Sequence, residues 1–150
     1  MGKGAVEVVL IEDNEYDLEL ALNVLNRSGV GTGVVVLRDG VEALKYFGCD
    51  EHSPQREGEA RAENTALGAL PRLVLLDLKL PRVDGLEVLS RLKRSPRTAH
   101  VPVVAFTSSR QASDVRTAYE LGVNSYVVKP VPFEEYADAL KVPGAVGAND

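Results

Sequence analysis

Acidic, hydroxyl and basic side chains stand at four places in the chain where a run of apolar residues ends. Glu12 and Asp13 follow "AVEVVLI", Asp77 follows "RLVLL", Thr107 ends "VPVVAFT", and Lys129 follows "SYVV". Three carboxylates that lie close together repel one another and raise one another's pKa unless a cation neutralises them. Mg²⁺ prefers oxygen ligands and few carboxylates, and it is usually shared with a phosphate.

The same residue types suit phosphoryl chemistry. An aspartate can act as a nucleophile toward phosphorus and form an aspartyl phosphate. The transferred group spreads its charge over its oxygens, which need partners such as a lysine and a hydroxyl. Each residue alone has an ordinary explanation as a helix cap, a turn residue or a solvated lysine. The combination predicts a magnesium site that handles a phosphoryl group, provided that the four places meet in the folded chain.

Five apolar segments alternate with five segments of helical periodicity. Strict alternation predicts an α/β fold with a doubly wound five-stranded parallel sheet and helices on both faces. Ligands of such sheets bind at the carboxyl ends of the strands, so the chemical residues are expected to meet at one edge. The predicted strands are 5–11, 33–37, 72–78, 101–107 and 125–128, and the predicted helices are 14–29, 39–47, 84–95, 111–122 and 132–140.

Two helices carry clear end signals and apolar stripes. Asn14 is a plausible cap of the first helix, and Gly29 is its expected stop. Asp84 with Glu87 three positions later matches a capping box in which Asp replaces Ser or Thr. The residues expected to face inward are Leu18, Ala21, Leu22 and Leu25 in the first helix, and Leu86, Leu89 and Leu92 in the third.

Composition limits the class of protein. The 150 residues, 45% hydrophobic and 26% charged, suit one globular domain. No apolar run approaches the roughly 20 residues of a membrane helix, so we expect a cytoplasmic protein without membrane association. A net charge of −5 argues against a nucleic-acid partner. Cys49 is the only cysteine, which excludes an intrachain disulfide. We expect residues 49–70 to form a long loop insert and residues 142–150 a loose tail.

Four motifs at these strand ends are specific in combination: "LIEDN", "LLDLKLPRVDG", "FTSS" and "SYVVKP". On these motifs, residues 5–141 resemble the receiver domain of bacterial two-component response regulators. The resemblance, rather than the spacing, implies a flavodoxin-like sheet with strand order 2-1-3-4-5. It also implies a phosphorylation-dependent signalling switch rather than an enzyme. Such a switch accepts a phosphoryl group from a sensor histidine kinase, with Mg²⁺ as cofactor.

The resemblance assigns the acids of the site. Asp77 matches the phosphoacceptor. Glu12 and Asp13 match the acidic pair that holds Mg²⁺, with Asp13 as the direct ligand and Glu12 acting mostly through water. Asp77 and the backbone carbonyl of Lys79 match the remaining protein ligands of the metal.

The resemblance also assigns the residues that respond to the phosphoryl group. Thr107 and Tyr126 match the switch hydroxyl and the switch aromatic. Lys129 matches the phosphate-binding lysine, and Ser108 matches the small residue that leaves room for the phosphoryl group. The bond between Lys129 and Pro130 is expected to be cis.

The stretches "DGVEALKYF" and "AYELGVNSYVVKPV", together with the insert, are similar to stand-alone regulators paired with bacterial phytochromes. A bacterial phytochrome is therefore the kind of kinase partner that the resemblance implies. We expect no output domain after residue 141, so the signal must leave through a protein surface. We expect a homodimer through the fourth helix, the fifth strand and the last helix, where aromatic and apolar side chains gather. They are Tyr119, Tyr126, Val128, Phe133 and Tyr136.

Three other functions fit these residues less well. A phosphatase or phosphotransferase of the haloacid-dehalogenase type also uses an aspartyl nucleophile, but it needs an Asp two positions later, where this chain has Lys79. A flavin-binding domain needs a Gly- or Ser/Thr-rich loop after the first strand, where this chain has "EDNEYD". A degenerate receiver would lack Asp77, Thr107 or Lys129, and all three are present.

Overall fold

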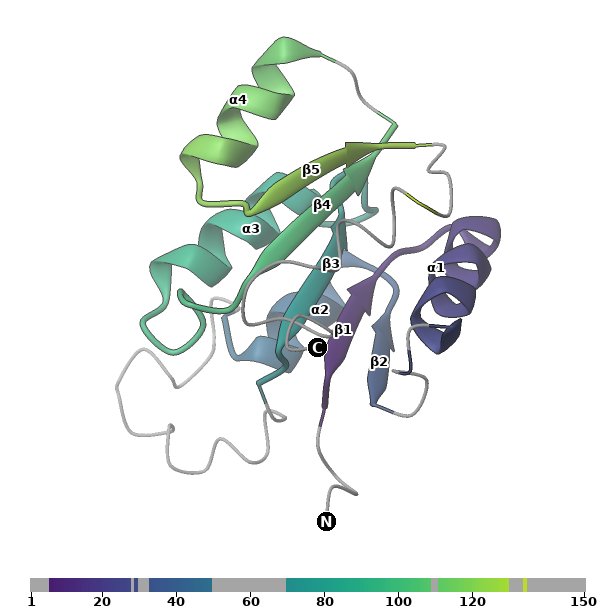
Figure 1. The fold of residues 1–150 in the computed structure, drawn as a ribbon. Helices are drawn as coiled ribbons and strands as arrows, with labels where there is room; N and C mark the ends of the chain where they lie inside the picture. The colour runs from purple at the N-terminus through teal and green to yellow at the C-terminus, as the bar shows by residue number, and fades with distance from the viewer. Residues whose placement is uncertain are drawn as a thin grey trace.

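A computed structural model shows one sheet of five strands with helices on both of its faces (Figure 1). The structure describes residues 6–27, 29, 33–49, 70–108, 111–129 and 134. The strands are β1 (Val8–Ile11), β2 (Val34–Leu37), β3 (Leu73–Asp77), β4 (Val103–Thr107) and β5 (Ser125–Val128). The helices are α1 (Glu15–Arg27), α2 (Gly40–Phe47), α3 (Gly85–Arg94) and α4 (Ala112–Glu120).

The strands pair in the order β2-β1-β3-β4-β5, and every pair is parallel. The predicted fold class and strand order are therefore confirmed. The first strand is shorter than predicted, because it begins at Val8, where its partners Val34 and Leu73 also begin. Asp77 and Thr107 are the last residues of β3 and β4, so these strands deliver polar side chains to one edge of the sheet.

Alternate strand residues face two separate apolar clusters. On one face, Leu10 and Leu75 pack with the buried stripe of α1. On the other face, Val9 and Leu76 pack with α2, α3 and Ala118 of α4. Figure 1 shows α1 on one side of the sheet, and α2 and α3 on the other. Both faces are covered, which explains why the strands are apolar throughout rather than alternating with polar residues.

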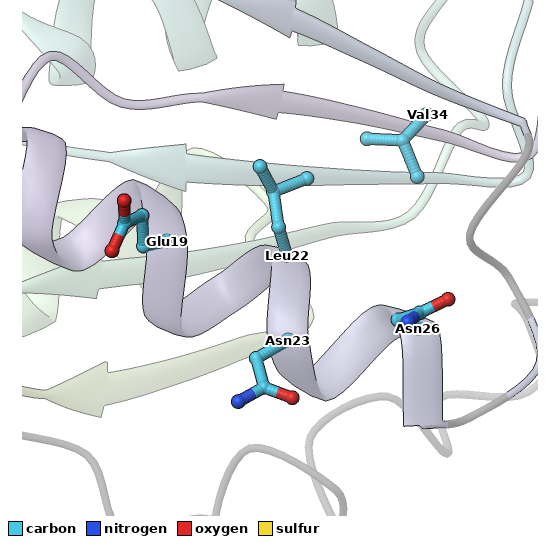
Figure 2. Close-up of a pocket in the computed structure, with 5 residues that line it drawn as sticks. All are labelled: Glu19, Leu22, Asn23, Asn26 and Val34. Atoms are coloured by element: carbon cyan, nitrogen blue, oxygen red, sulfur yellow. The ribbon is translucent and has the colours of Figure 1, made fainter.

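Two predicted inward leucines lie at the rim of the core. Leu22 is half-buried, and Val24 is buried in its place, because Leu22 lies at the sheet edge beside Val34 (Figure 2). Leu86 is also half-buried, because the glycine before it takes the inward position at the start of α3. Val88 completes that stripe.

The predicted cap of α1 is confirmed, whereas the predicted capping box of α3 is wrong. The Asp17 amide donates to Asn14 Oδ1 at 2.9 Å. Asp84 stands at the N-cap position of α3, but its side chain makes no capping hydrogen bond. The carboxylate that should complete the box is engaged elsewhere, since Glu87 Oε2 accepts from Arg91 Nε at 2.8 Å. An ion pair one turn along the helix has replaced the reciprocal cap.

Several predictions fall outside the described residues. They are the last helix (132–140) with Phe133 and Tyr136, the cis bond before Pro130, nearly all of the insert at 49–70, and the tail at 142–150. Within the described part of the chain, no helix combines the length and the hydropathy that crossing a membrane requires.

Candidate functional site

A cleft of about 420 Å³ lies at the carboxyl ends of the strands. Its walls come from the segment after β1, the first turn of α1, and the ends of β3, β4 and β5. The fold thus joins places that are more than a hundred residues apart in the chain. The residues that line the cleft are Asp13, Asn14, Asp17, Asp77, Lys79, Ser108 and Lys129.

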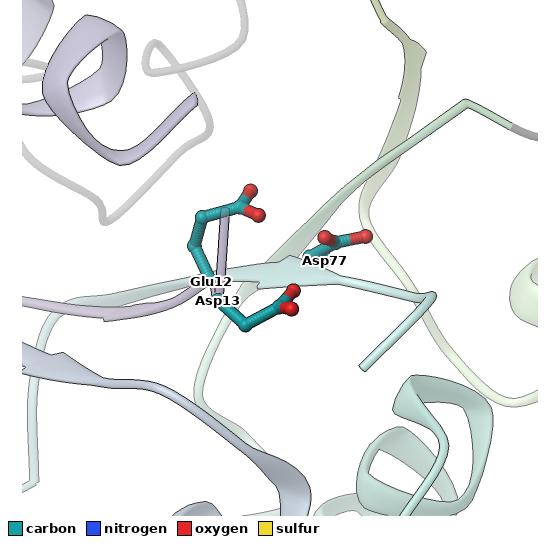
Figure 3. Close-up of side chains that lie close together, drawn as sticks. All are labelled: Glu12, Asp13 and Asp77. Carbon is teal, nitrogen blue, oxygen red and sulfur yellow. The ribbon is translucent and has the colours of Figure 1, made fainter. Parts of the chain in front are cut away.

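Three carboxylates gather at this edge. Glu12 and Asp13 follow β1, and Asp77 ends β3 beside them (Figure 3). One carboxylate oxygen from each lies within 4.8 Å of the others. Glu12 and Asp77 are buried, with 3% and 5% of their surface exposed, whereas Asp13 is open to solvent. This set of oxygens, with one open side, fits a hard divalent cation that keeps part of its water shell.

Asp77 is held by its own backbone neighbours. The Lys79 amide donates to Asp77 Oδ1 at 2.9 Å, which fixes the carboxylate direction. The chain then turns back sharply, and the Gly85 amide donates to the Leu78 carbonyl at 3.0 Å. A Cβ on Gly85 would lie 2.5 Å from the Asp77 carbonyl oxygen. The glycine is therefore needed for α3 to begin this close to the acid.

The Lys129 ammonium contacts three carboxylates. Its Nζ donates to Asp17 Oδ2 at 2.8 Å, to Glu12 Oε1 at 2.9 Å and to Asp77 Oδ2 at 3.2 Å. A lysine ammonium has three N–H donors, so each of them has a carboxylate acceptor. The Lys129 amide donates to the Thr107 carbonyl at 2.8 Å, which ties the end of β5 to the end of β4.

These surroundings raise the pKa of both Glu12 and Lys129, which favours the neutral form of the acid and the charged form of the lysine. Burial raises the pKa of Glu12 to about 7, and the hydrogen bond with Asp77 adds to the rise. Burial disfavours the charged form of Lys129, but its hydrogen bonds with Asp17 and Glu12 outweigh burial and raise its pKa. Lys129 is therefore charged at neutral pH, and a cation bound beside Glu12 would favour the Glu12 carboxylate.

Thr107 and Tyr126 lie beside the cleft rather than in its lining. Thr107 ends β4 at the same edge, but it is fully buried. Tyr126 is half-buried and pairs in register with Ala105, two residues before Thr107. Tyr126 and Ala105 belong to the cluster that α2, α3 and α4 cover. The two residues therefore connect the cleft edge with the α4 side of the sheet.

Asp17 was missed by the sequence analysis, although it makes the shortest contact with Lys129. The available signal was its spacing, since it follows Asp13 by four positions and lies in the first turn of the helix after the acidic pair. That signal is ambiguous, because acids are favoured in the first turn of any helix. Lys79, by contrast, points its ammonium toward α4, where Nζ lies 3.8 Å from Asp114 Oδ2.

A second cavity, of about 540 Å³, lies between α1 and the edge strand β2. Figure 2 shows its lining residues on α1 and on β2. They are Glu19, Leu22, Asn23, Asn26 and Val34. The cavity holds a single carboxylate and two amides, with no second acid and no lysine among its described lining residues, so we place the chemistry in the strand-end cleft.

Comparison with known families agrees with this geometry. The model of the response regulator receiver domain matches residues 8–141. The chain belongs to the response regulator receiver family. It is 43% identical over 128 residues to the probable methanogenesis regulatory protein FilR2 of Methanothrix harundinacea, a match covering 85% of this chain and 74% of that protein. It is 38% identical over 122 residues to response regulator Rcp1 of Synechocystis, covering 81% and 75%.

Solved structures are similar over nearly the whole chain. The bacteriophytochrome response regulator AtBRR shares 45% identity at a TM-score of 0.70 and covers 94% of both chains. The Mn²⁺-bound form of Rcp1 shares 33% identity at a TM-score of 0.69, covering 89% of this chain and 88% of that one. The phosphorylated cyanobacterial phytochrome response regulator RcpA shares 34% identity at a TM-score of 0.71, covering 90% and 89%.

Proposed function

We propose that this receiver accepts a phosphoryl group from a sensor histidine kinase on Asp77, with Mg²⁺, and thereby acts as a signalling switch. The observation that carries the proposal is the meeting of Asp77 with two further carboxylates and Lys129 at the ends of β1, β3 and β5. Two solved relatives support it: RcpA is phosphorylated in its crystal structure, and Rcp1 binds Mn²⁺ in its structure.

The metal would be held by the carboxylates of Asp13 and Asp77 and by the backbone carbonyl of Lys79, with the Glu12 carboxylate acting mostly through water. When bound, Mg²⁺ supplies positive charge, which offsets the repulsion between an anionic phosphoryl donor and the acids. The open side of the cleft at Asp13 suits an ion that keeps water ligands and shares the donor phosphate.

In the transfer itself, an Asp77 carboxylate oxygen attacks the phosphorus of a phosphohistidine. The new O–P bond forms as the P–N bond breaks, and the imidazole nitrogen keeps the electron pair. Lys129 is positioned to bind a phosphoryl oxygen, because its Nζ already lies 3.2 Å from Asp77 Oδ2. Ser108 lines the cleft with a small side chain, which leaves space for the group.

The output step follows from the place of Thr107. A phosphoryl group on Asp77 draws the Thr107 hydroxyl toward the cleft as a donor, and the half-buried Tyr126 turns into the space behind it. A modification of this kind shifts two states that differ by only a few kcal/mol. The face of α4 and β5 then changes shape, and Tyr119, half exposed on α4, marks the area where a partner or a second copy binds.

The partner class follows from the relatives. AtBRR is named a bacteriophytochrome response regulator, and RcpA a phytochrome response regulator. We therefore place a phytochrome-type histidine kinase, in the cytoplasm, as the phosphoryl donor. A protein partner also suits the net charge of −5 better than a nucleic acid does.

An aspartyl phosphatase is not favoured. That chemistry needs a carboxylic acid two residues after the nucleophile, and Lys79 stands there. Its ammonium faces Asp114 and cannot donate a proton as a carboxylic acid would. A signalling role is the better account.

Intact mass spectrometry tests the proposal. Incubation with acetyl phosphate and Mg²⁺ should add the mass of one phosphoryl group to the wild type, and a chelator should prevent it. Asp77→Asn should stay unmodified. Asp84→Asn, which removes an exposed acid from the same loop, should be labelled like the wild type. Equal labelling of Asp77→Asn and the wild type would sink the proposal.

A further inference from the structure

The contact between Asp17 and Lys129 is not used by the proposed function, since Asp17 lies outside the group of carboxylates that could hold a metal. At 2.8 Å it is the shortest of the three contacts of Lys129 Nζ, and the contact with Asp77 is the longest at 3.2 Å. Asp17 itself is held in place, because its amide donates to the Asn14 side chain at the start of α1. A fixed acid therefore holds the ammonium at the wall of the cleft.

The other two acceptors of Lys129 are groups that the proposed reaction uses. Glu12 belongs to the carboxylates that could hold the metal, and Asp77 becomes an acyl phosphate. Asp17 is the acceptor that neither step consumes. Holding a lysine side chain in one place costs conformational entropy. An anchor that persists through the reaction keeps the side chain ordered, so that this cost is not added to the barrier of phosphoryl transfer.

We propose that Asp17 is a positioning residue, which holds Lys129 Nζ beside Asp77 before and after phosphoryl transfer. This inference rests on the proposed function. When acetyl phosphate is the donor, an Asp77 oxygen forms the new bond to phosphorus, the P–O bond to acetate breaks, and acetate leaves with the electron pair. The N–H of Lys129 that faced Asp77 Oδ2 then meets a phosphoryl oxygen, while Asp17 retains the nitrogen through another N–H.

The test compares two substitutions that differ in one property. Asp17→Ala removes the acceptor, whereas Asp17→Asn keeps an oxygen at the same distance along the side chain. At saturating Mg²⁺ and acetyl phosphate, we expect the Asp17→Ala phosphorylation rate to fall about tenfold, through loss of pre-organisation. Asp17→Asn should stay within about threefold of the wild-type rate, because a neutral acceptor still orients an ammonium.

Glu19→Ala is the matched control, because it removes the same charge from an exposed position on the same helix, outside the strand-end cleft. It should react at the wild-type rate. If Asp17→Ala does not fold, as judged by thermal unfolding, Asp17→Ser takes its place. The serine hydroxyl is one bond shorter than the carboxylate, so it does not put an acceptor where the Asp17 carboxylate oxygen lies. Saturation with Mg²⁺ keeps any change in metal affinity out of the comparison.

The possible results separate the two proposals. A wild-type chain that takes no phosphoryl group would overturn the proposed function, and the role of Asp17 with it. A labelled wild type with an equally fast Asp17→Ala would overturn the role of Asp17 alone. An Asp17→Asn variant as slow as Asp17→Ala would also overturn it, because charge and not position would then control the rate.

Discussion

The strands and helix that support the cleft edge are more deeply buried than α4 and β5. Every residue of β1 and β3 is buried, and α3 buries Gly85 and three apolar side chains. In β5 only Val127 is buried, and α4 buries only Ala118 although it is nearly as long as α3. Within the described part of the chain, the acids therefore stand on fully buried strands, whereas α4 and β5 bury few of their own side chains.

This difference suits a switch. Elements that move in response to a ligand or a modification come from the less stable part of a fold, because a tightly packed core resists small displacements. Thr107 lies at the boundary, since it ends buried β4 and pairs in register with half-buried Val128. The proposed phosphorylation of Asp77 can thus act on α4 and β5 without disturbing the strands that hold the proposed metal ligands.

Core substitution should expose the contrast most strongly. Leu89 of α3 is fully buried, so Leu89→Ala should lower the free energy of unfolding by about 2–5 kcal/mol. Val115 of α4 is only half-buried, and Val115→Ala should cost about 1 kcal/mol or less. Urea unfolding followed by circular dichroism measures both. Equal losses for the two variants would remove the packing difference on which the comparison depends.

A glycine substitution should affect stability and chemistry together. A Cβ at position 85 would lie 2.4 Å from Leu78 Cα and 2.5 Å from the Asp77 carbonyl oxygen, with no flexible side chain to yield. Gly85→Ala should therefore cost about 1–3 kcal/mol and slow phosphorylation of Asp77.

Gly29→Ala is the control for that substitution. Gly29 has a φ of 86° but open space around the position of an added Cβ. The substitution should therefore lower the free energy of unfolding by about 1–2 kcal/mol and leave the phosphorylation rate unchanged. A wild-type rate in Gly85→Ala would show that the turn beside Asp77 is not part of the site.

A pH effect should originate in the cleft alone. Without a divalent cation, Glu12 has a pKa of about 7 in the folded protein against its ordinary 4.5, so the folded state binds that proton more tightly. Its contribution to stability is fully present below pH 4.5 and is lost as the pH rises through about 7. Because Glu12 and Asp77 interact, the titration belongs to the pair.

Urea unfolding of the metal-free protein at pH 5 and pH 8 measures this loss. The wild type should lose more stability between the two values than Glu12→Gln, which has no carboxyl group to titrate. Added Mg²⁺ should stabilise the wild type more at pH 8 than at pH 5, because the cation competes with the proton. The same pH response in both proteins would place the titration elsewhere.

The fold could be predicted from the sequence because its signals are local. Uniformly apolar segments alternate with helical stripes, and Asp77 and Thr107 end strands as expected. The strand order came from the resemblance to a family and not from spacing, since nothing in the sequence pattern states which strands are neighbours. Its confirmation in the structure is therefore a test of the resemblance.

The details that sequence reasoning missed depend on distant residues. Leu22 belongs to an apolar stripe, but its burial depends on whether the sheet continues beyond Val34, and β2 is the edge strand. Asp17 resembles any acid in a first helical turn, and only the folded chain brings Lys129 to it from 112 positions away. Asp84 and Glu87 fit a capping box, but the Glu87 carboxylate instead accepts a hydrogen bond from Arg91, one turn later.

The most direct test of the central claim is an amide NMR spectrum of the protein with Mg²⁺, before and after addition of beryllofluoride, which mimics a phosphoryl group on Asp77. The account predicts large shifts at the cleft and across residues 112–128 of α4 and β5, including Tyr126, with small shifts in α3. Asp77→Asn should show none of these changes. Shifts that stop at the cleft and leave α4 and β5 unchanged would contradict the account.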